Sequence, residues 1–125
     1  MRQITVENKT RTLSQPIRAK YCASFMCQLR GLTFHRTLNI QEGLLLVQKR
    51  ESVVDSSIHM LAVGMELAVI WIDSRLNVVD VRLARPWRPV YVPQKPARYV
   101  LEISASRLGD FQPGDQVEFC DLAYS

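Results

Sequence analysis

The sequence predicts a mainly β protein of the α+β class: a small barrel-like or rolled, mostly antiparallel sheet of about seven strands, with one short helix near the N-terminus. Two observations predict this fold. Short stretches with apolar residues at every second position recur along the chain, and side chains of a strand alternate between its two faces. Only one stretch has the helical spacing of apolar residues, so helices are too few for a sheet built from βαβ units.

The chain has 125 residues, of which 47% are hydrophobic, and this is the size of one ordinary domain. We therefore expect residues 1–125 to form a single domain. The opening "MRQITVENKT" alternates polar and apolar residues, unlike a signal peptide, and the longest apolar run, "LAVIWI", is far shorter than the ~20 residues of a membrane-spanning helix. These features predict a soluble, cytoplasmic protein without a membrane segment.

The first half of the chain holds the expected first strand and the helix. "QITVE" is typical of a strand. Between Cys22 and Leu32 the apolar residues fall three or four apart, which indicates one face of a helix, and Gly31 is placed to help end it. The next expected strands are "GLLLVQK", "SIHML" and "ELAVIWID". The last is apolar at both parities, which predicts a central strand covered on both faces.

The second half predicts three more strands. "NVVDVRLA" is expected to carry Val79 and Val81 on one face, after a turn "DSRLN" in which Asn77 is better suited than Leu76 to a left-handed conformation. In "ARYVLEIS" the polar side carries Arg98 and Glu102. "SRLGDFQPGDQVEFC" predicts a short helical turn, a tight turn and a final strand.

The compositional break is "RPWRPVYVPQKPAR", which contains four of the six prolines. Proline lacks a backbone donor, so we expect a stiff loop or edge rather than a central strand. Arginines interleave here with Trp87 and Tyr91, a mixture suited to an anionic or planar partner. The alternative is that Trp87 folds inward and plugs the barrel, because tryptophan is usually largely buried.

The three cysteines lack the paired C-x2-C spacing of a zinc site. Cys22 and Cys27 lie five apart on the expected helix, which rotates their side chains by roughly 140°. We therefore predict three free, structural thiols.

His59, in "SSIHML", is one of only two histidines, and the other is His35. These two and the dispersed acidic residues do not predict a metal site. In a strand, Ser57 is the nearest hydroxyl on the same face as His59, but no third group is in evidence to orient the imidazole. The sequence thus predicts no catalytic residue, no bound metal and no cofactor, and favours a structural role for His59 over ligand contact.

The net charge of +4 is uneven. Residues 1–50 hold nine Lys and Arg against two acidic residues, whereas residues 51–125 hold seven against ten. A basic face attracts phosphates, but nucleic-acid binding normally adds a reading helix or an aromatic platform. The chain shows no such motif, so we interpret the charge as a solvated surface.

Six segments together resemble, in order, those of the domain of unknown function 192 family, a bacterial and archaeal family of small β domains. The resemblance runs from about Ile4 to Leu122 and implies a compact β-barrel-like fold with a short helix and no established activity. The segments are "LRGLTFHRTL", "GLLL", "SSIHM", "VIWIDSRLNVVDVRLARPWRP", "PARYVLEI" and "PGDQVEF".

The chain departs from the family pattern at two places. Thr33 and His35 replace the usual methionine and arginine of the Gly-Leu-Met-x-Arg segment, and Ala68 stands where the family usually has the aspartate of Pro-Leu-Asp. Alanine can neither accept a proton nor bind a cation. If the family uses that carboxylate, this chain has lost that function or performs another task.

Two classes of function remain open, with a third more distant. The first is a non-catalytic binding or accessory module for a small anionic or peptide ligand or a protein partner. The second is a metal-dependent or hydrolase-like enzyme using His35, His59 and a carboxylate such as Asp73. Weak nucleic-acid binding is the third. The residues predicted to contact a ligand, with the proline-rich loop contributing most, are His59, Trp87, Arg88, Tyr91 and Arg98.

Overall fold

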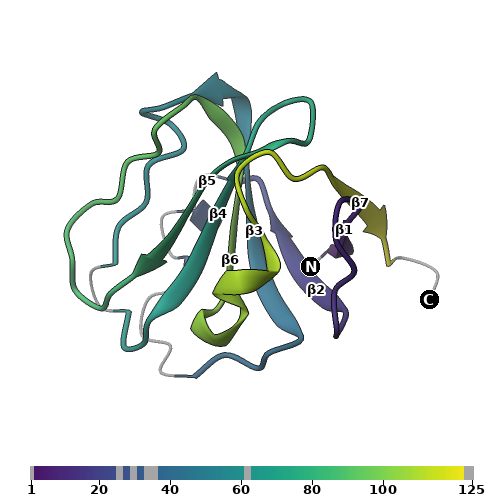
Figure 1. Ribbon diagram of the computed structural model, residues 1–125. Helices are drawn as coiled ribbons and strands as arrows, with labels where there is room; N and C mark the ends of the chain where they lie inside the picture. Colours follow the sequence, from purple (N-terminus) through teal and green to yellow (C-terminus); the bar gives the residue numbers. More distant parts are fainter. Residues whose placement is uncertain (1, 25–26, 29–30, 33–36, 61–62, 123–125) are drawn as a thin grey trace.

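Seven strands form one curled, half-barrel sheet (Figure 1). The computed structural model describes residues 2–24, 27–28, 31–32, 37–60 and 63–122. The strand order across the sheet is β5-β4-β6-β3-β2-β1-β7, and all neighbours are antiparallel except β2 and β3. The mainly β, mostly antiparallel fold of seven strands is therefore confirmed. The strands are β1 (Gln3–Asn8), β2 (Ile17–Cys22), β3 (Glu42–Ser52), β4 (Leu67–Ile72), β5 (Val78–Ala84), β6 (Ala97–Ser104) and β7 (Val117–Asp121).

The alternation of side chains builds a buried cluster on each face of this sheet. The first cluster takes side chains from all seven strands and is enclosed by the curl, with Phe111 packed among them. The second lies on the opposite face, where Ile58, Met60 and Tyr91 cover the central strands. Every residue of β4 is buried, as predicted, because its odd and even positions serve different clusters.

Strand β5 does not follow the predicted alternation. Val81 packs against the first cluster, whereas Val79 packs against the second, so the two do not share a face. The register of β5 on β4 shifts between Trp71 and Ile72, and the extra residue of this bulge inverts the alternation beyond it.

The turn between β4 and β5 places the left-handed residue at Leu76, not at Asn77. Leu76 has φ of 66°. The carboxylate of Asp73 accepts hydrogen bonds from the backbone N–H groups of Arg75 (3.0 Å) and Asn77 (2.9 Å), and Asp73 N–H donates to the Asn77 carbonyl (2.9 Å). These bonds fix a loop in which Leu76, the residue before Asn77, has a left-handed backbone conformation, as in hairpins with a bulge after the turn.

The predicted helical turn and final strand are both present. The 3-10 helix η1 (Ala105–Asp110) packs against β4, β5 and β6. Its buried Arg107 pairs with Asp110 (2.7 Å) and donates to the carbonyls of Gln15, Pro16 and Ile40, which ties the turn to two distant loops. Val117 of β7 is buried as expected.

The helix predicted from Cys22 to Leu32 is only partly described. Cys22 is the last residue of β2, which shows that the helix does not begin there. Cys27 and Gln28 are helical, while residues 25–26 and 29–30 lie outside the described residues.

The stretch "SIHML" is likewise not a full strand: Ile58 forms an isolated bridge to Tyr91, and Leu61 lies outside the described residues.

Cys22 and Cys27 form a disulfide, so the prediction of three free thiols is wrong. The prediction assumed that one helix carries both residues. Because Cys22 ends a strand and the chain turns before Cys27, the two Cα atoms lie 5.7 Å apart, within reach of a disulfide.

Within the part of the chain that the structure describes, no helix is both long and apolar enough to cross a membrane.

Candidate functional site

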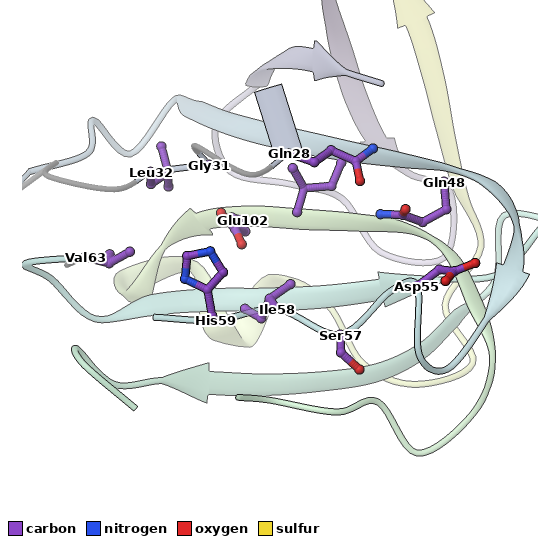
Figure 2. Close-up of a pocket in the computed structure, with 11 residues that line it drawn as sticks. Gln28, Gly31, Leu32, Gln48, Asp55, Ser57, Ile58, His59, Val63 and Glu102 are labelled. Carbon is purple, nitrogen blue, oxygen red and sulfur yellow. The ribbon is translucent and has the colours of Figure 1, made fainter. Parts of the chain in front are cut away.

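A small cavity lies between the central strands and the segment that carries His59 (Figure 2). Its volume is about 80 Å³. Strand β6 contributes one charged residue and β3 contributes an apolar and an amide side chain, while described residues that precede β3 and others between β3 and β4 close the other sides. The described lining residues are Gln28, Gly31, Leu32, Leu46, Gln48, Asp55, Ser57, Ile58, His59, Val63 and Glu102.

Glu102 is a buried acid in the middle of the sheet. It lies on β6 opposite Leu44 of β3 and Val69 of β4, and only 5% of its surface is exposed. Burial in these apolar surroundings raises the pKa of Glu102 to about 7, because desolvation disfavours the charged carboxylate. Glu102 thus lies on the opposite side of the strand from Leu101 and Ile103, as the alternation predicted, and this side is covered by other segments.

His59 is held in place through its neighbours in the chain. Ile58 exchanges two backbone hydrogen bonds with Tyr91, at 3.0 and 2.8 Å. Met60 N–H donates to the Arg88 carbonyl (3.1 Å), and Trp87 N–H donates to the Met60 carbonyl (2.8 Å). These bonds attach the segment carrying His59 to the proline-rich loop.

The Nδ1 atom of His59 is buried without a hydrogen-bond partner. The imidazole ring and the carboxyl group of Glu102 both line the same cavity, as Figure 2 shows. Leaving a buried polar atom unpaired costs roughly 1–3 kcal/mol. A ligand that hydrogen-bonds this nitrogen would recover that free energy.

Other polar groups at the cavity are already engaged. Ser57 donates its hydroxyl to the Val53 carbonyl (2.9 Å), and Asp55 pairs with Arg50 (3.0 Å) near the surface. Gln28 donates its amide N–H groups to the carbonyls of Val47 (2.7 Å) and Cys22 (3.3 Å).

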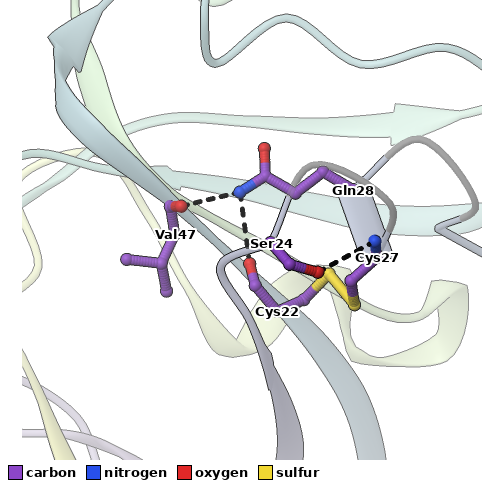
Figure 3. The surroundings of a disulfide bond; sticks show 5 residues. All are labelled: Cys22, Ser24, Cys27, Gln28 and Val47. Atoms are coloured by element: carbon purple, nitrogen blue, oxygen red, sulfur yellow. Dashed lines mark hydrogen bonds between the residues drawn. A yellow bond between two sulfur atoms is a disulfide. The ribbon is translucent and has the colours of Figure 1, made fainter.

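The disulfide lies next to this amide anchor (Figure 3). Cys27 immediately precedes Gln28, and Cys22 supplies one of its two carbonyl acceptors. The Cys27 backbone N–H also bonds to the hydroxyl of Ser24 (3.1 Å). The disulfide therefore helps to hold one wall of the cavity against β2 and β3.

The residues predicted to contact a ligand do not gather around this cavity. Of the five, only His59 is among its described lining residues. Tyr91 is 3% exposed, and its hydroxyl oxygen accepts a hydrogen bond from the Arg85 backbone N–H (2.8 Å), so it packs in the second cluster. Arg98 donates to the Gln48 carbonyl (3.2 Å) from the same face of β6 as Glu102.

Trp87 and Arg88 lie at the surface of the proline-rich loop. Trp87 is 63% exposed and has φ of 66°, so the interpretation of Trp87 as a buried plug is wrong. The guanidinium of Arg88 lies 4.6 Å from the centre of the Tyr91 ring, which supports the loop from outside. Val90 and Val92 are also exposed, so the loop displays apolar and cationic groups together.

The groups named for the enzyme alternative are not brought together. Asp73 caps the β4–β5 turn and is not among the described residues that line the cavity. His35 lies outside the described residues. Among the residues that the structure does describe, no group of three His, Cys, Asp or Glu is arranged to hold a metal ion.

Ala68, the position where the family usually has an aspartate, faces away from this cavity. Its side chain is in the first cluster with Ile103, whereas Glu102 and Val69 face the second. A carboxylate at residue 68 would thus point to the opposite side of the sheet from His59.

Comparisons with known proteins define the class of protein. The model of the DUF192 family, described as "Uncharacterized ACR, COG1430", matches residues 5–119. The chain therefore belongs to this family, as the sequence predicted.

Individual relatives agree with this assignment. A UPF0127 protein of Thermococcus gammatolerans is 36% identical over 98 residues, which are 77% of this chain and 62% of that protein. The chain thus spans less than two thirds of that relative's length. UPF0127 protein TK1120 of Thermococcus kodakarensis is 31% identical over 90% of this chain and 71% of its own. The crystal structure of a protein of unknown function from Novosphingobium aromaticivorans superposes with a TM-score of 0.78 and 25% identity, over 93% of this chain and 83% of that one.

Proposed function

We propose that the protein is a non-catalytic binding module and that the cavity between His59 and Glu102 is its ligand site. The ligand is a small polar group, which belongs either to a small molecule or to the end of a peptide or protein partner. The observation that carries this proposal is the unpartnered Nδ1 of His59, buried in a cavity beside a buried carboxyl group. Buried polar atoms are nearly always paired, so an orphaned one inside a cavity points to a missing partner.

The proline-rich loop supports a role for a larger partner. It is attached by backbone hydrogen bonds to Ile58 and Met60, on either side of His59. Exposed tryptophan and arginine side chains supply much of the energy of protein interfaces, and a loop already fixed in place loses little entropy on binding. Trp87 and Arg88 would therefore contact the part of a peptide or protein ligand that remains outside the cavity.

The bonding of Ser57 favours binding over hydrolysis. A Ser–His pair requires the hydroxyl to donate to the imidazole, whereas Ser57 donates to the Val53 carbonyl.

A fragment screen followed by NMR of the 15N-labelled protein tests the proposal. Polar fragments of roughly three to six non-hydrogen atoms match a cavity of this size. We expect some of them to shift the backbone signals of Ser57, His59 and Glu102, and His59→Ala to weaken that binding at least fivefold. Ser74→Ala, at an exposed turn position, is the control. Absence of any binding at these residues, or equal binding by His59→Ala, would overturn the proposal.

A further inference from the structure

Most of the polar atoms that the cavity leaves available are hydrogen-bond acceptors, and the side-chain amide of Gln48 adds both a donor and an acceptor. Both carboxyl oxygens of Glu102 accept when the group is ionised, and the unpartnered Nδ1 of His59 accepts when the imidazole is neutral with its proton on Nε2. Gln28 commits its amide nitrogen to the carbonyls of Val47 and Cys22 and so offers no free donor there.

No described residue that lines the cavity is Lys or Arg. An anion placed there would meet the carboxyl group of Glu102 without a Lys or Arg among the described lining residues to balance it, which is costly in a desolvated site. The walls formed by Leu32, Leu46 and Val63 are apolar and suit a short hydrocarbon stem.

Resting on the binding role proposed above, we propose that the group received by this cavity is a primary ammonium, held by the ionised carboxylate of Glu102 with His59 Nδ1 as a further acceptor. A primary ammonium presents three donors from a compact point charge, and the two carboxylate oxygens and Nδ1 offer three acceptors. The volume of about 80 Å³ admits such a group on a short stem. Free alkylamines, a peptide N-terminus and a lysine side chain all carry this chemistry.

Binding of an ammonium is coupled to the loss of a proton from Glu102. Without ligand, burial raises the pKa of Glu102 to about 7, so the carboxyl group is mostly protonated at pH 6 and mostly ionised at pH 8. Alkylammonium ions stay charged over this interval. From this single titration, affinity should rise roughly tenfold between pH 6 and pH 8.

Among the described residues, the other ionisable groups that face Glu102 come from the cavity lining and from the neighbouring strands. The described lining of the cavity adds Asp55 and His59. A positively charged imidazole would repel an ammonium and so weaken its binding, as the loss of charge on Glu102 does. On β4, the residues of this face, Leu67, Val69 and Trp71, carry no charge. On the other strands, charged residues of the same face include Arg98 on β6, Glu42 on β3, Arg18 and Lys20 on β2, the ion pair of Asp80 with Arg82 on β5, and Glu7 and Glu118 on the edge pair β1 and β7.

The test measures dissociation constants of methylammonium by NMR titration of the full chain at pH 6, 7 and 8. Acetate and acetamide serve as the anionic and neutral probes of similar size. We expect methylammonium to bind at Ser57, His59 and Glu102 with affinity rising roughly tenfold across this range, and to bind at least tenfold more tightly at pH 8 than either comparison probe. Glu102→Gln keeps the shape and removes the charge, and should weaken methylammonium binding at pH 8 at least tenfold. Glu42→Gln, an exposed acid on the neighbouring strand, should change it less than twofold.

The outcomes separate the two proposals. If acetate or acetamide binds at the cavity as well as methylammonium, or if Glu102→Gln binds methylammonium normally, the ammonium proposal is overturned while the binding role stands. If none of the probes shifts the cavity signals, and the fragment screen also finds no ligand there, the binding role itself fails. Parallel titrations with ethylammonium, glycinamide and Nα-acetyl-lysine methylamide identify the source, since the tightest of the three shows whether a free amine, an N-terminus or a lysine side chain fits best.

Discussion

At the scale of single residues, two buried polar groups distinguish this protein from a purely structural β domain. Glu102 and His59 line one cavity, and neither is paired there with a described side chain of opposite charge. Natural proteins keep such costly groups mainly where they serve function. The burial of Glu102 has a direct consequence for stability.

We predict that the stability of the protein falls as pH rises through the titration of Glu102. Its pKa is about 7 in the folded protein and 4.5 when unperturbed, so the folded state holds more protons between these values. The stabilising contribution is complete below pH 4.5 and is lost as pH rises through 7, by about 3 kcal/mol. Urea unfolding at pH 5 to 8 should show a steeper loss of stability for wild type than for Glu102→Gln. Identical slopes for the two proteins would show that Glu102 titrates normally.

A second prediction concerns Trp87, whose side chain is mostly exposed. Trp87→Ala should keep the fold and change the free energy of unfolding by less than about 0.5 kcal/mol, because surface side chains contribute little. Trp71→Ala is the matched comparison: Trp71 is fully buried and donates its indole N–H to the Ser56 carbonyl (2.7 Å), so it should cost about 3–5 kcal/mol. Thermal and urea unfolding measure both. If Trp87→Ala destabilised the protein as much as Trp71→Ala, the interpretation of Trp87 as a buried plug would be restored.

At the scale of elements, the disulfide joins the end of β2 to the segment that carries Gln28. The expectation of a cytoplasmic protein stays a prediction, and a disulfide is more typical of an oxidising compartment.

The third prediction is that the native protein contains one free thiol, that of Cys120. Alkylation under non-reducing conditions followed by mass spectrometry should label one cysteine before reduction and three after it. Replacing Cys22 and Cys27 together by Ala should lower the free energy of unfolding by about 2 kcal/mol, because the bridge closes a short loop. Cys120→Ala is the control. Labelling of all three cysteines in the untreated protein would contradict the pairing.

The sequence predicts a strand correctly where the pattern of apolar residues within that strand is sufficient. β1, β4 and the final strand follow from their own patterns of apolar residues. Predictions fail where a distant segment decides the outcome. The bulge in β5 shifts Val79 and Val81 apart, and the segment around Ile58 covers a face of β6 that would otherwise be polar and exposed. For this reason Glu102 could not be recognised as a site residue, although His59 could.

At the scale of the whole molecule, the half-barrel has a cluster on each face, and the cavity belongs to the second. The aspartate that the family resemblance led us to expect at Ala68 would therefore lie on the opposite side of the sheet. The family assignment and the fold were predictable because they depend on many segments in order, whereas the site depends on contacts between four parts of the chain that span residues 28 to 102.

The central claim is that Glu102 is a buried, ligand-accessible acid, and its titration tests this most directly. The protein is labelled with 13C at the glutamate side-chain carboxyl carbons, and the Glu102 signal is assigned by its loss in Glu102→Gln. The carboxyl signal should titrate with a pKa of about 7 in the free protein, and saturating methylammonium should lower that pKa. A Glu102 signal that titrates near 4.5 in the free protein, or one whose titration is unchanged by methylammonium, would contradict the account.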